Sequence, residues 1–218
     1  HYRCNRRIIE FNNKKYYHSR LNICSGSDEQ RPLVYMDVKS SQNNLKNTAD
    51  QEVNEIVRYA RANRDKSVGV ITPFANQKKL IEETLQREGL QNVACGTVHA
   101  FQGDEKDVIL FSTAITNQTH SGTYEWLKNN KELINVATSR AREKLIVLSD
   151  SENLARLHQT DGEDDLFELV EYVKKNGESH VTEKHVNSRA LGVKPFSTAT
   201  EEAFMANLNH ALQNIWLS

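Results

Sequence analysis

Short apolar runs alternate with longer amphipathic segments along this chain. The apolar runs are continuous, which is typical of strands that are buried on both faces of a parallel sheet. They occupy residues 33–38, 68–71, 93–98, 108–111 and 144–148. The pattern therefore predicts a strand at each of these places.

The amphipathic segments between the runs predict helices. In residues 48–63 apolar side chains recur at helical spacing, and Thr48 with Gln51 has the spacing of a capping box. A second helix is expected to follow Phe74 and to continue through Leu85. Further helices are predicted over residues 133–142, 164–175 and 200–217.

This order predicts an α/β fold, a parallel sheet with helices on both faces and a helical extension at the C-terminal end. We expect residues 1–150 to form the main domain and residues 151–177 to form a helical packing extension. Residues 178–218 are expected to be a linker and an amphipathic helix. The apolar stripe of that helix suits either ordinary packing or docking against a following domain.

The most informative stretch is GTVHAFQGDEKDVILFS, residues 96–112. Thr97 and Val98 close one apolar run, and a polar interval with Gly103 at its centre leads to the next run. We interpret this as a strand, a tight glycine turn and a second strand. In a parallel sheet a ligand is expected at such a turn.

The composition limits the classes of function. The chain has 218 residues, of which 38% are hydrophobic, and its formal charge is -1. Any contact with nucleic acid must therefore use a local basic patch and not overall basicity. No apolar run reaches the ~20 residues of a membrane span, and no secretory leader is visible. We expect a soluble chain that is an excised piece of a larger protein.

The three cysteines, Cys4, Cys24 and Cys95, lie far apart and have no CxxC spacing. This arrangement argues against a disulfide framework and against a zinc site, so no metal is expected in this chain. A reducing cytoplasm is the expected location.

The first 20 residues hold a local excess of positive charge, with six lysines or arginines and one glutamate. One interpretation is a solvated amphipathic helix. The other is that Tyr2 and Arg3 form a site, because a flat ring can stack on a base and a guanidinium can grip a phosphate.

Four motifs occur in a characteristic order and spacing. They are HYRC at residues 1–4, VGVITPFANQ at 68–77, GTVHAFQGDEKDVILFS at 96–112 and LINVATSRAREKLIVLSD at 133–150. Together they resemble the second motor domain of superfamily 1 helicases, closest to the group of the nonsense-mediated-decay helicase and its bacterial DNA helicase relatives. The resemblance covers roughly residues 1–150. It implies a RecA-like fold of the P-loop NTPase type.

The resemblance implies catalytic roles for two arginines. Arg140, the first arginine of SRAR, matches the family's arginine finger, and a guanidinium suits the charge that develops on a transferred phosphoryl group. Arg3 would hold the γ-phosphate, and Tyr2 would stack on the adenine. Without the resemblance, Arg140 reads as a charge on a helix surface. For Arg142 a phosphate contact and a structural ion pair both remain open.

The QGxE turn is expected to complete the ATP site. Gly103 would let the backbone approach the phosphates, and Gln102 belongs to the same matched turn. Glu105 would accept hydrogen bonds from the ribose hydroxyls. The alternative is an ordinary turn with a solvated glutamate.

A second set of matched residues is expected to touch single-stranded nucleic acid. Thr72, Thr97 and His99 offer hydroxyl and imidazole groups that suit contacts with the phosphate backbone, which position a strand without reading its sequence. His99 also fits a satisfied histidine at a strand end. Gln77 fits a helix-capping or surface role equally well.

The sequence contains no GxxxxGK[ST] phosphate loop and no acidic strand end before HYRC. ATP and Mg²⁺ are therefore expected to need a first motor domain earlier in the same chain, with the magnesium ligands there. We expect the fragment alone neither to hydrolyse ATP nor to unwind a duplex, while the full protein does both.

Two alternatives remain. The strand could be RNA, because the family contains both kinds of member, although residues 116–130, with Trp126, resemble the DNA-acting bacterial members. Alternatively, the motor could be degenerate and serve only as a nucleic-acid-binding module.

Overall fold

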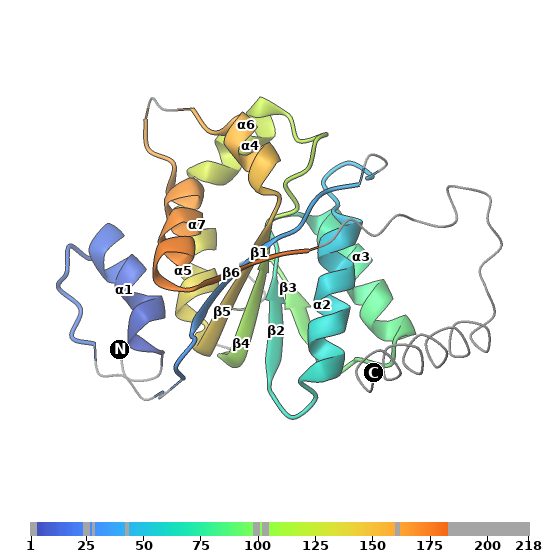
Figure 1. Ribbon diagram of the computed structural model, residues 1–218, viewed down its shortest axis with the longest axis horizontal. Helices are drawn as coiled ribbons and strands as arrows, with labels where there is room; N and C mark the ends of the chain where they lie inside the picture. Colours follow the sequence, from blue (N-terminus) through green and yellow to red (C-terminus); the bar gives the residue numbers. More distant parts are fainter. Residues whose placement is uncertain are drawn as a thin grey trace, which may run out of the picture. The chain divides into compact units, whose positions relative to one another are not determined.

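The computed structural model describes residues 4–23, 27, 29–41, 44–97, 101, 105–159 and 162–182. Its strands are β1 (Leu33–Asp37), β2 (Val68–Ile71), β3 (Ala94–Gly96), β4 (Lys106–Ser112), β5 (Ala141–Ser149) and β6 (Glu178–Val181). Its helices are α1 (Arg6–Lys15), α2 (Asp50–Ala62), α3 (Ala75–Arg87), α4 (Ser121–Lys128), α5 (Lys131–Ser139), α6 (Ser151–Leu157) and α7 (Asp165–Asn176). Figure 1 shows the strands between two groups of helices.

The strands form one sheet in the order β3-β2-β4-β5-β1-β6. Every pair of neighbouring strands is parallel. All strands therefore begin at one edge of the sheet, the amino edge, and end at the other, the carboxyl edge. This confirms the predicted fold class, because a parallel sheet requires crossover connections that put helices on its faces.

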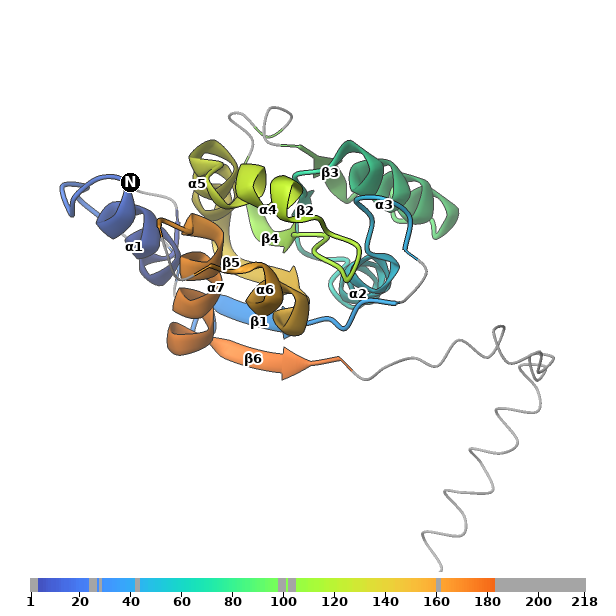
Figure 2. The ribbon, with the colours of Figure 1, turned by 90° about the horizontal axis from the view of Figure 1, so that it is seen from above.

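Side chains alternate between the two faces, and each face has its own core. Ile109 and Phe111 of β4 pack with residues of α1, α4, α5 and α7. Val108 and Leu110 of the same strand pack with residues of α2 and α3. Figure 2 shows the two layers of helices on either side of the sheet. The continuous apolar runs of the sequence are explained by this burial on both faces.

The start of α2 differs from the sequence prediction. Thr48 does not cap the helix, because its hydroxyl donates to the carbonyl of Leu45 at 2.8 Å. Ala49 is the N-cap residue, and its N–H donates to Oε1 of Gln77 at 2.8 Å. The capping-box prediction was therefore wrong, since a glutamine from α3 satisfies the backbone in place of a local hydroxyl.

The predicted helix over residues 133–142 is shorter at its C-terminal end. The helix α5 ends at Ser139, Arg140 is its C-cap residue, and Arg142 lies in β5. The prediction was wrong here because the strand begins two residues after the helix, with no polar loop to mark the change.

The end of the chain's described part adds a strand to the sheet. Residues 178–181 begin the predicted linker, but they form β6, which pairs with β1. Gly177 makes this approach possible, because a Cβ atom there would clash with the carbonyl oxygen of Leu33. The helices α4 and α6 were also missing from the prediction.

The connection from β3 to β4 is not a tight reversal. Both strands pair in parallel with β2, one on each side of it. The chain must therefore cross from the carboxyl edge, after Gly96, back to the amino edge, before Lys106. Phe101 in this connection is buried, and its ring would lie 2.8 Å from a Cβ atom at Gly69 of β2. Gly69 thus leaves the space through which the connection passes.

The described elements belong to a compact unit, His1–Thr182. The predicted helix over residues 200–217 lies outside the described residues, and the division into domains stays a prediction. Among the helices of the described part, none is long and apolar enough to cross a membrane.

Candidate functional site

Three of the residues predicted to act on ATP, Glu105, Arg140 and Arg142, lie at the amino edge of the sheet. In the β4–β5 pair Lys106 lies opposite Ala141. Glu105 and Arg140 directly precede these two residues, so two motifs that are 35 residues apart in sequence become neighbours. Strand register alone therefore brings together the predicted finger and the acidic end of the QGxE turn.

Backbone contacts on three sides hold Arg140 in place. Its N–H donates to the carbonyl of Val136 at 3.1 Å, and its own carbonyl accepts from the N–H of Lys106 at 3.0 Å. Its Nε donates to the carbonyl of Phe101 at 2.9 Å. Within the described residues no hydrogen bond or ion pair engages its two terminal nitrogens. Among the described residues, the guanidinium is therefore positioned through its Nε and its backbone and not by an acidic partner.

The N-terminal segment is attached to the same place. The thiol of Cys4 donates to the carbonyl of Ser139 at 3.1 Å, and the N–H of Asn5 donates to the carbonyl of Arg142 at 2.8 Å. Burial and, to a smaller extent, the charge of Glu105 raise the pKa of Cys4 to about 12, while the charge of Arg140 opposes the shift. Cys4 is thus a buried, inert thiol within electrostatic reach of both groups.

Arg142 is engaged in a structural contact. Its Nη2 lies 2.8 Å from Oδ1 of Asp107, and it also donates to the hydroxyl of Ser67 at 3.4 Å. Burial raises the pKa of Asp107, but hydrogen bonds from Ser67 and the charge of Arg142 outweigh it, so the pKa lies below its usual value. Of the two interpretations of Arg142, the geometry favours the ion pair.

Two of the residues predicted to bind nucleic acid, Thr72 and Thr97, lie at the carboxyl edge. Thr72 directly follows β2, and Thr97 directly follows β3. The N–H of Thr72 donates to the carbonyl of Gly96 at 3.2 Å, which ties the two strand ends together. The side chain of Thr72 is fully buried, and its hydroxyl has no hydrogen-bond partner among the described residues. Thr97 is partly exposed.

A buried polar network joins the carboxyl end of β4 to α2 and α3. Gln77 donates to the hydroxyl of Ser112 at 3.0 Å, and Ser112 donates to Oε2 of Glu52 at 2.6 Å. The same oxygen accepts from the N–H of Ala114 at 3.1 Å. Burial raises the pKa of Glu52 to about 8, against the hydrogen bonds that lower it. The network fixes the segment that leaves β4, and of the roles left open for Gln77 it supports capping.

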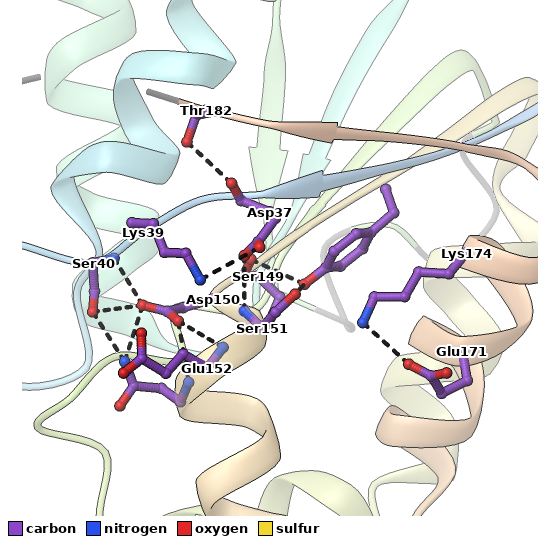
Figure 3. Close-up of polar contacts among 12 residues, drawn as sticks. Asp37, Lys39, Ser40, Ser149, Asp150, Ser151, Glu152, Glu171, Lys174 and Thr182 are labelled. Atoms are coloured by element: carbon purple, nitrogen blue, oxygen red, sulfur yellow. Dashed lines mark hydrogen bonds and ion pairs between the residues drawn. The ribbon is translucent and has the colours of Figure 1, made fainter. Parts of the chain in front are cut away.

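A second polar cluster lies at the carboxyl ends of β1 and β5 (Figure 3). Asp150 caps α6 through the N–H groups of Glu152 and Asn153, and its other oxygen accepts from Ser40. Asp37 accepts from the N–H of Ser151 at 2.9 Å. Both carboxylates accept hydrogen bonds from backbone N–H groups. Among the described residues no group of three or more side chains suits a metal ion.

Five of the predicted site residues lie outside the described residues. They are Tyr2, Arg3, His99, Gln102 and Gly103. Their predicted roles stay predictions.

Glu52 and Asp107 hold neighbouring segments together through their hydrogen bonds and ion pair, but the sequence did not predict these roles. Glu52 stands in the first turn of an amphipathic helix, where an acidic residue is ordinary, so nothing in the sequence marked its burial. Asp107 was hidden in a charged run, DEKD.

Comparison with known proteins gives several matches. The family model described as "AAA domain" matches residues 1–152. The mouse DNA replication ATP-dependent helicase/nuclease DNA2 is 36% identical over 89 residues, which are 41% of this chain and 8% of that protein. The DNA polymerase alpha-associated DNA helicase A of Saccharomyces cerevisiae is 28% identical over 195 residues, covering 71% of this chain and 27% of that protein.

Mouse RNA helicase Mov10l1 is 25% identical over 205 residues, which cover 81% of this chain and 17% of the relative. This chain thus spans about a quarter or less of the length of these relatives. Among solved structures, the C-terminal domain of a possible DNA helicase from Lactobacillus plantarum superposes with a TM-score of 0.46 at 16% identity, covering 72% of this chain and 94% of that one.

Proposed function

The chain belongs to the AAA domain family and contains a motor domain of the superfamily 1 helicases, and from this premise we propose that it is the second motor half of an ATP-dependent DNA helicase. In this role it supplies the arginine finger and part of the track for a single strand. A first motor domain of the same protein supplies the phosphate loop and the ligands of Mg²⁺. The ion neutralises charge on the phosphates when it is bound there.

The observation that carries the proposal is the geometry of Arg140. Its stem is fixed by the carbonyl of Phe101, and its backbone is fixed by Val136 and Lys106. A guanidinium that is positioned in advance can stabilise the charge on the γ-phosphoryl group without reorganising during the reaction. Glu105 stands beside it, where a carboxylate can accept from ribose hydroxyls.

Tyr2 and Arg3 complete this side in the proposal. They come directly before Cys4, whose thiol donates a hydrogen bond to the carbonyl of Ser139, the residue that precedes Arg140. Tyr2 stacks on the adenine, Arg3 adds a second positive group at the γ-phosphate, and Gln102 and Gly103 form the turn next to it. Arg142 acts as a positioning residue, since its ion pair with Asp107 fixes the start of β5.

The other edge holds the strand in the proposal. Thr97 and His99 contact its phosphates, and Thr72 joins them if its buried hydroxyl is uncovered on binding. The connection that contains Phe101 begins at Thr97 at this edge and ends at Glu105 at the other, so closing of the ATP cleft is passed to the strand-binding surface through one segment of the chain. Alternate closing and opening moves the motor along the strand.

We propose DNA as the strand because residues 116–130, with Trp126, resemble the bacterial DNA-acting members. RNA is the alternative, since one of the relatives is named an RNA helicase. Phosphate contacts from hydroxyl groups do not distinguish the two, because they touch no 2′-hydroxyl.

The test is ATP hydrolysis by the full-length parent protein, measured in single-turnover and steady-state experiments. Single-stranded DNA and RNA of matched sequence are compared with no strand. We expect stimulation by DNA and no turnover by the isolated 218-residue chain. Stimulation by RNA alone would replace the substrate in the proposal. Tight strand binding without hydrolysis would show a degenerate motor, and robust turnover by the isolated chain would contradict the division of labour.

A further inference from the structure

An exposed tryptophan stands at the carboxyl edge of the sheet. Among the described residues Trp126 is one of four exposed large apolar side chains, and 53% of it is accessible. Its neighbours Tyr124 and Leu127 on α4 are fully buried, so the helix is anchored by its other face. A ring of this size that stays exposed to water does not contribute the free energy that its burial would give, so its exposure is consistent with a binding role.

The ring stands beside the TPF motif. Its centroid is 6.1 Å from that of Phe74, with the ring planes tilted by 39°. Phe74 follows the carboxyl end of β2 and is the N-cap residue of α3, two residues after Thr72. Trp126 therefore lies at the edge where the predicted strand-binding residues Thr72 and Thr97 lie, although it comes from a different segment.

An open groove borders the tryptophan. Its volume is ≈ 530 Å³, within the range of ligand sites. It is lined by Glu125, Trp126, Asn129, Asn130, Lys131 and Glu132. Two carboxylates against one ammonium group make this a poor place for a phosphate, whereas an aromatic face beside amide groups suits an uncharged planar group.

We propose that Trp126 and the groove beside it hold one nucleobase of the single strand, with the base stacked on the indole ring. The inference rests on the proposed function and adds to it a base contact that none of the matched motifs contains. Stacking tolerates every base, as a motor that moves along a strand requires.

The test compares a single-stranded oligonucleotide with the same backbone carrying abasic sites, using the full-length protein. Loss of one stacked base weakens binding by about 5- to 150-fold in other single-strand-binding proteins. We expect Trp126→Ala to lose affinity within that range for the complete strand and to bind the abasic strand as the wild type does. Trp126→Phe should retain most of the affinity. Val181→Ala, which truncates another exposed apolar side chain, is the matched control.

Equal binding of the complete strand by Trp126→Ala and wild type would overturn the inference. Equal losses with both strands would do the same, because they would indicate a folding defect or a phosphate contact. A 5-iodouracil oligonucleotide gives a readout on the unaltered protein, since irradiation should crosslink it to the peptide that contains Trp126. Crosslinks confined to other peptides would also overturn it.

The two proposals fail separately. If a strand stimulates ATP hydrolysis by the wild type and binds equally well to Trp126→Ala, this inference is wrong and the proposed function still stands. A wild-type protein that binds no single strand would end both.

Discussion

The two edges of the sheet are built in contrasting ways. At the amino edge Arg140 is held by backbone carbonyls and an adjoining N–H group, and its terminal nitrogens engage none of the described side chains. At the carboxyl edge the polar groups of Thr72, Ser112 and Glu52 are buried, whereas the ring of Trp126 is exposed.

The difference matches the two kinds of ligand that we propose. A guanidinium fixed by its stem suits a small ligand of high charge, because its attraction is strong and directional. An exposed flat ring suits a strand that must be held and then released at each step. In this proposal the two edges of the sheet bind different ligands, and the segment that contains Phe101 lies between them in the chain.

The sharpest way to break the comparison is to remove the guanidinium. In the full-length protein, Arg140→Ala should lower ATP turnover by on the order of 10³-fold or more and leave ATP binding largely intact. Arg140→Lys should also be impaired, because an ammonium group keeps the charge but loses the planar fork. Stopped-flow hydrolysis and nucleotide titration measure the two quantities.

The matched control is Arg58→Ala. Arg58 is an exposed arginine of α2 that pairs with Glu55. Its removal should cost at most about 1 kcal/mol of stability, as for other surface ion pairs. Near-normal turnover by Arg140→Ala would remove this residue from its role.

The link between the edges can be disturbed at Gly69. A Cβ atom there would lie 2.8 Å from the ring of Phe101 and 2.9 Å from side-chain atoms of Ile109 and Lys106. Gly69→Val should therefore lower the free energy of unfolding by about 1–3 kcal/mol. Because the connection contacts both edges, affinity for ATP and affinity for the strand should fall together.

Gly122→Ala is the control for Gly69→Val, because a Cβ atom there meets nothing within 4 Å. Its free energy of unfolding should be at most about 1 kcal/mol above that of wild type, because the new Cβ atom meets no neighbour and alanine favours a helix more than glycine does. Chemical denaturation measures both variants. A Gly69→Val protein as stable as wild type, with a loss at one ligand only, would argue against a shared connection.

The sequence predicted the layers and most element bounds well, but it misplaced the end of α5 and the capping of α2 and missed β6. Continuous apolar runs required a parallel sheet, and the resemblance to superfamily 1 helicases drawn from four motifs is confirmed by the family match. The capping of α2 could not be predicted, because the group that caps Ala49 comes from Gln77, which is 28 residues away. The strand β6 was missed for a different reason, because its residues are largely exposed and carry no apolar pattern.

The candidate site was predictable in its parts and not in its arrangement. Motif matching named Arg140 and Arg142 together, but only the strand register separates a positioned guanidinium from one that is paired with Asp107. The QGDE turn was expected where parallel strands end. Glu105, the one described residue of this turn, instead directly precedes β4 at the amino edge, because β2 lies between β3 and β4 and the chain must return to that edge.

Hydrogen–deuterium exchange of the full-length protein tests the central claim, that the two edges serve different ligands. A non-hydrolysable ATP analogue should slow exchange in peptides that cover residues 105–107 and 139–142. A single-stranded oligonucleotide should slow exchange in those that cover residues 72–77 and 121–132. The opposite pattern, with the nucleotide protecting the carboxyl edge and the strand protecting residues 139–142, would contradict the account.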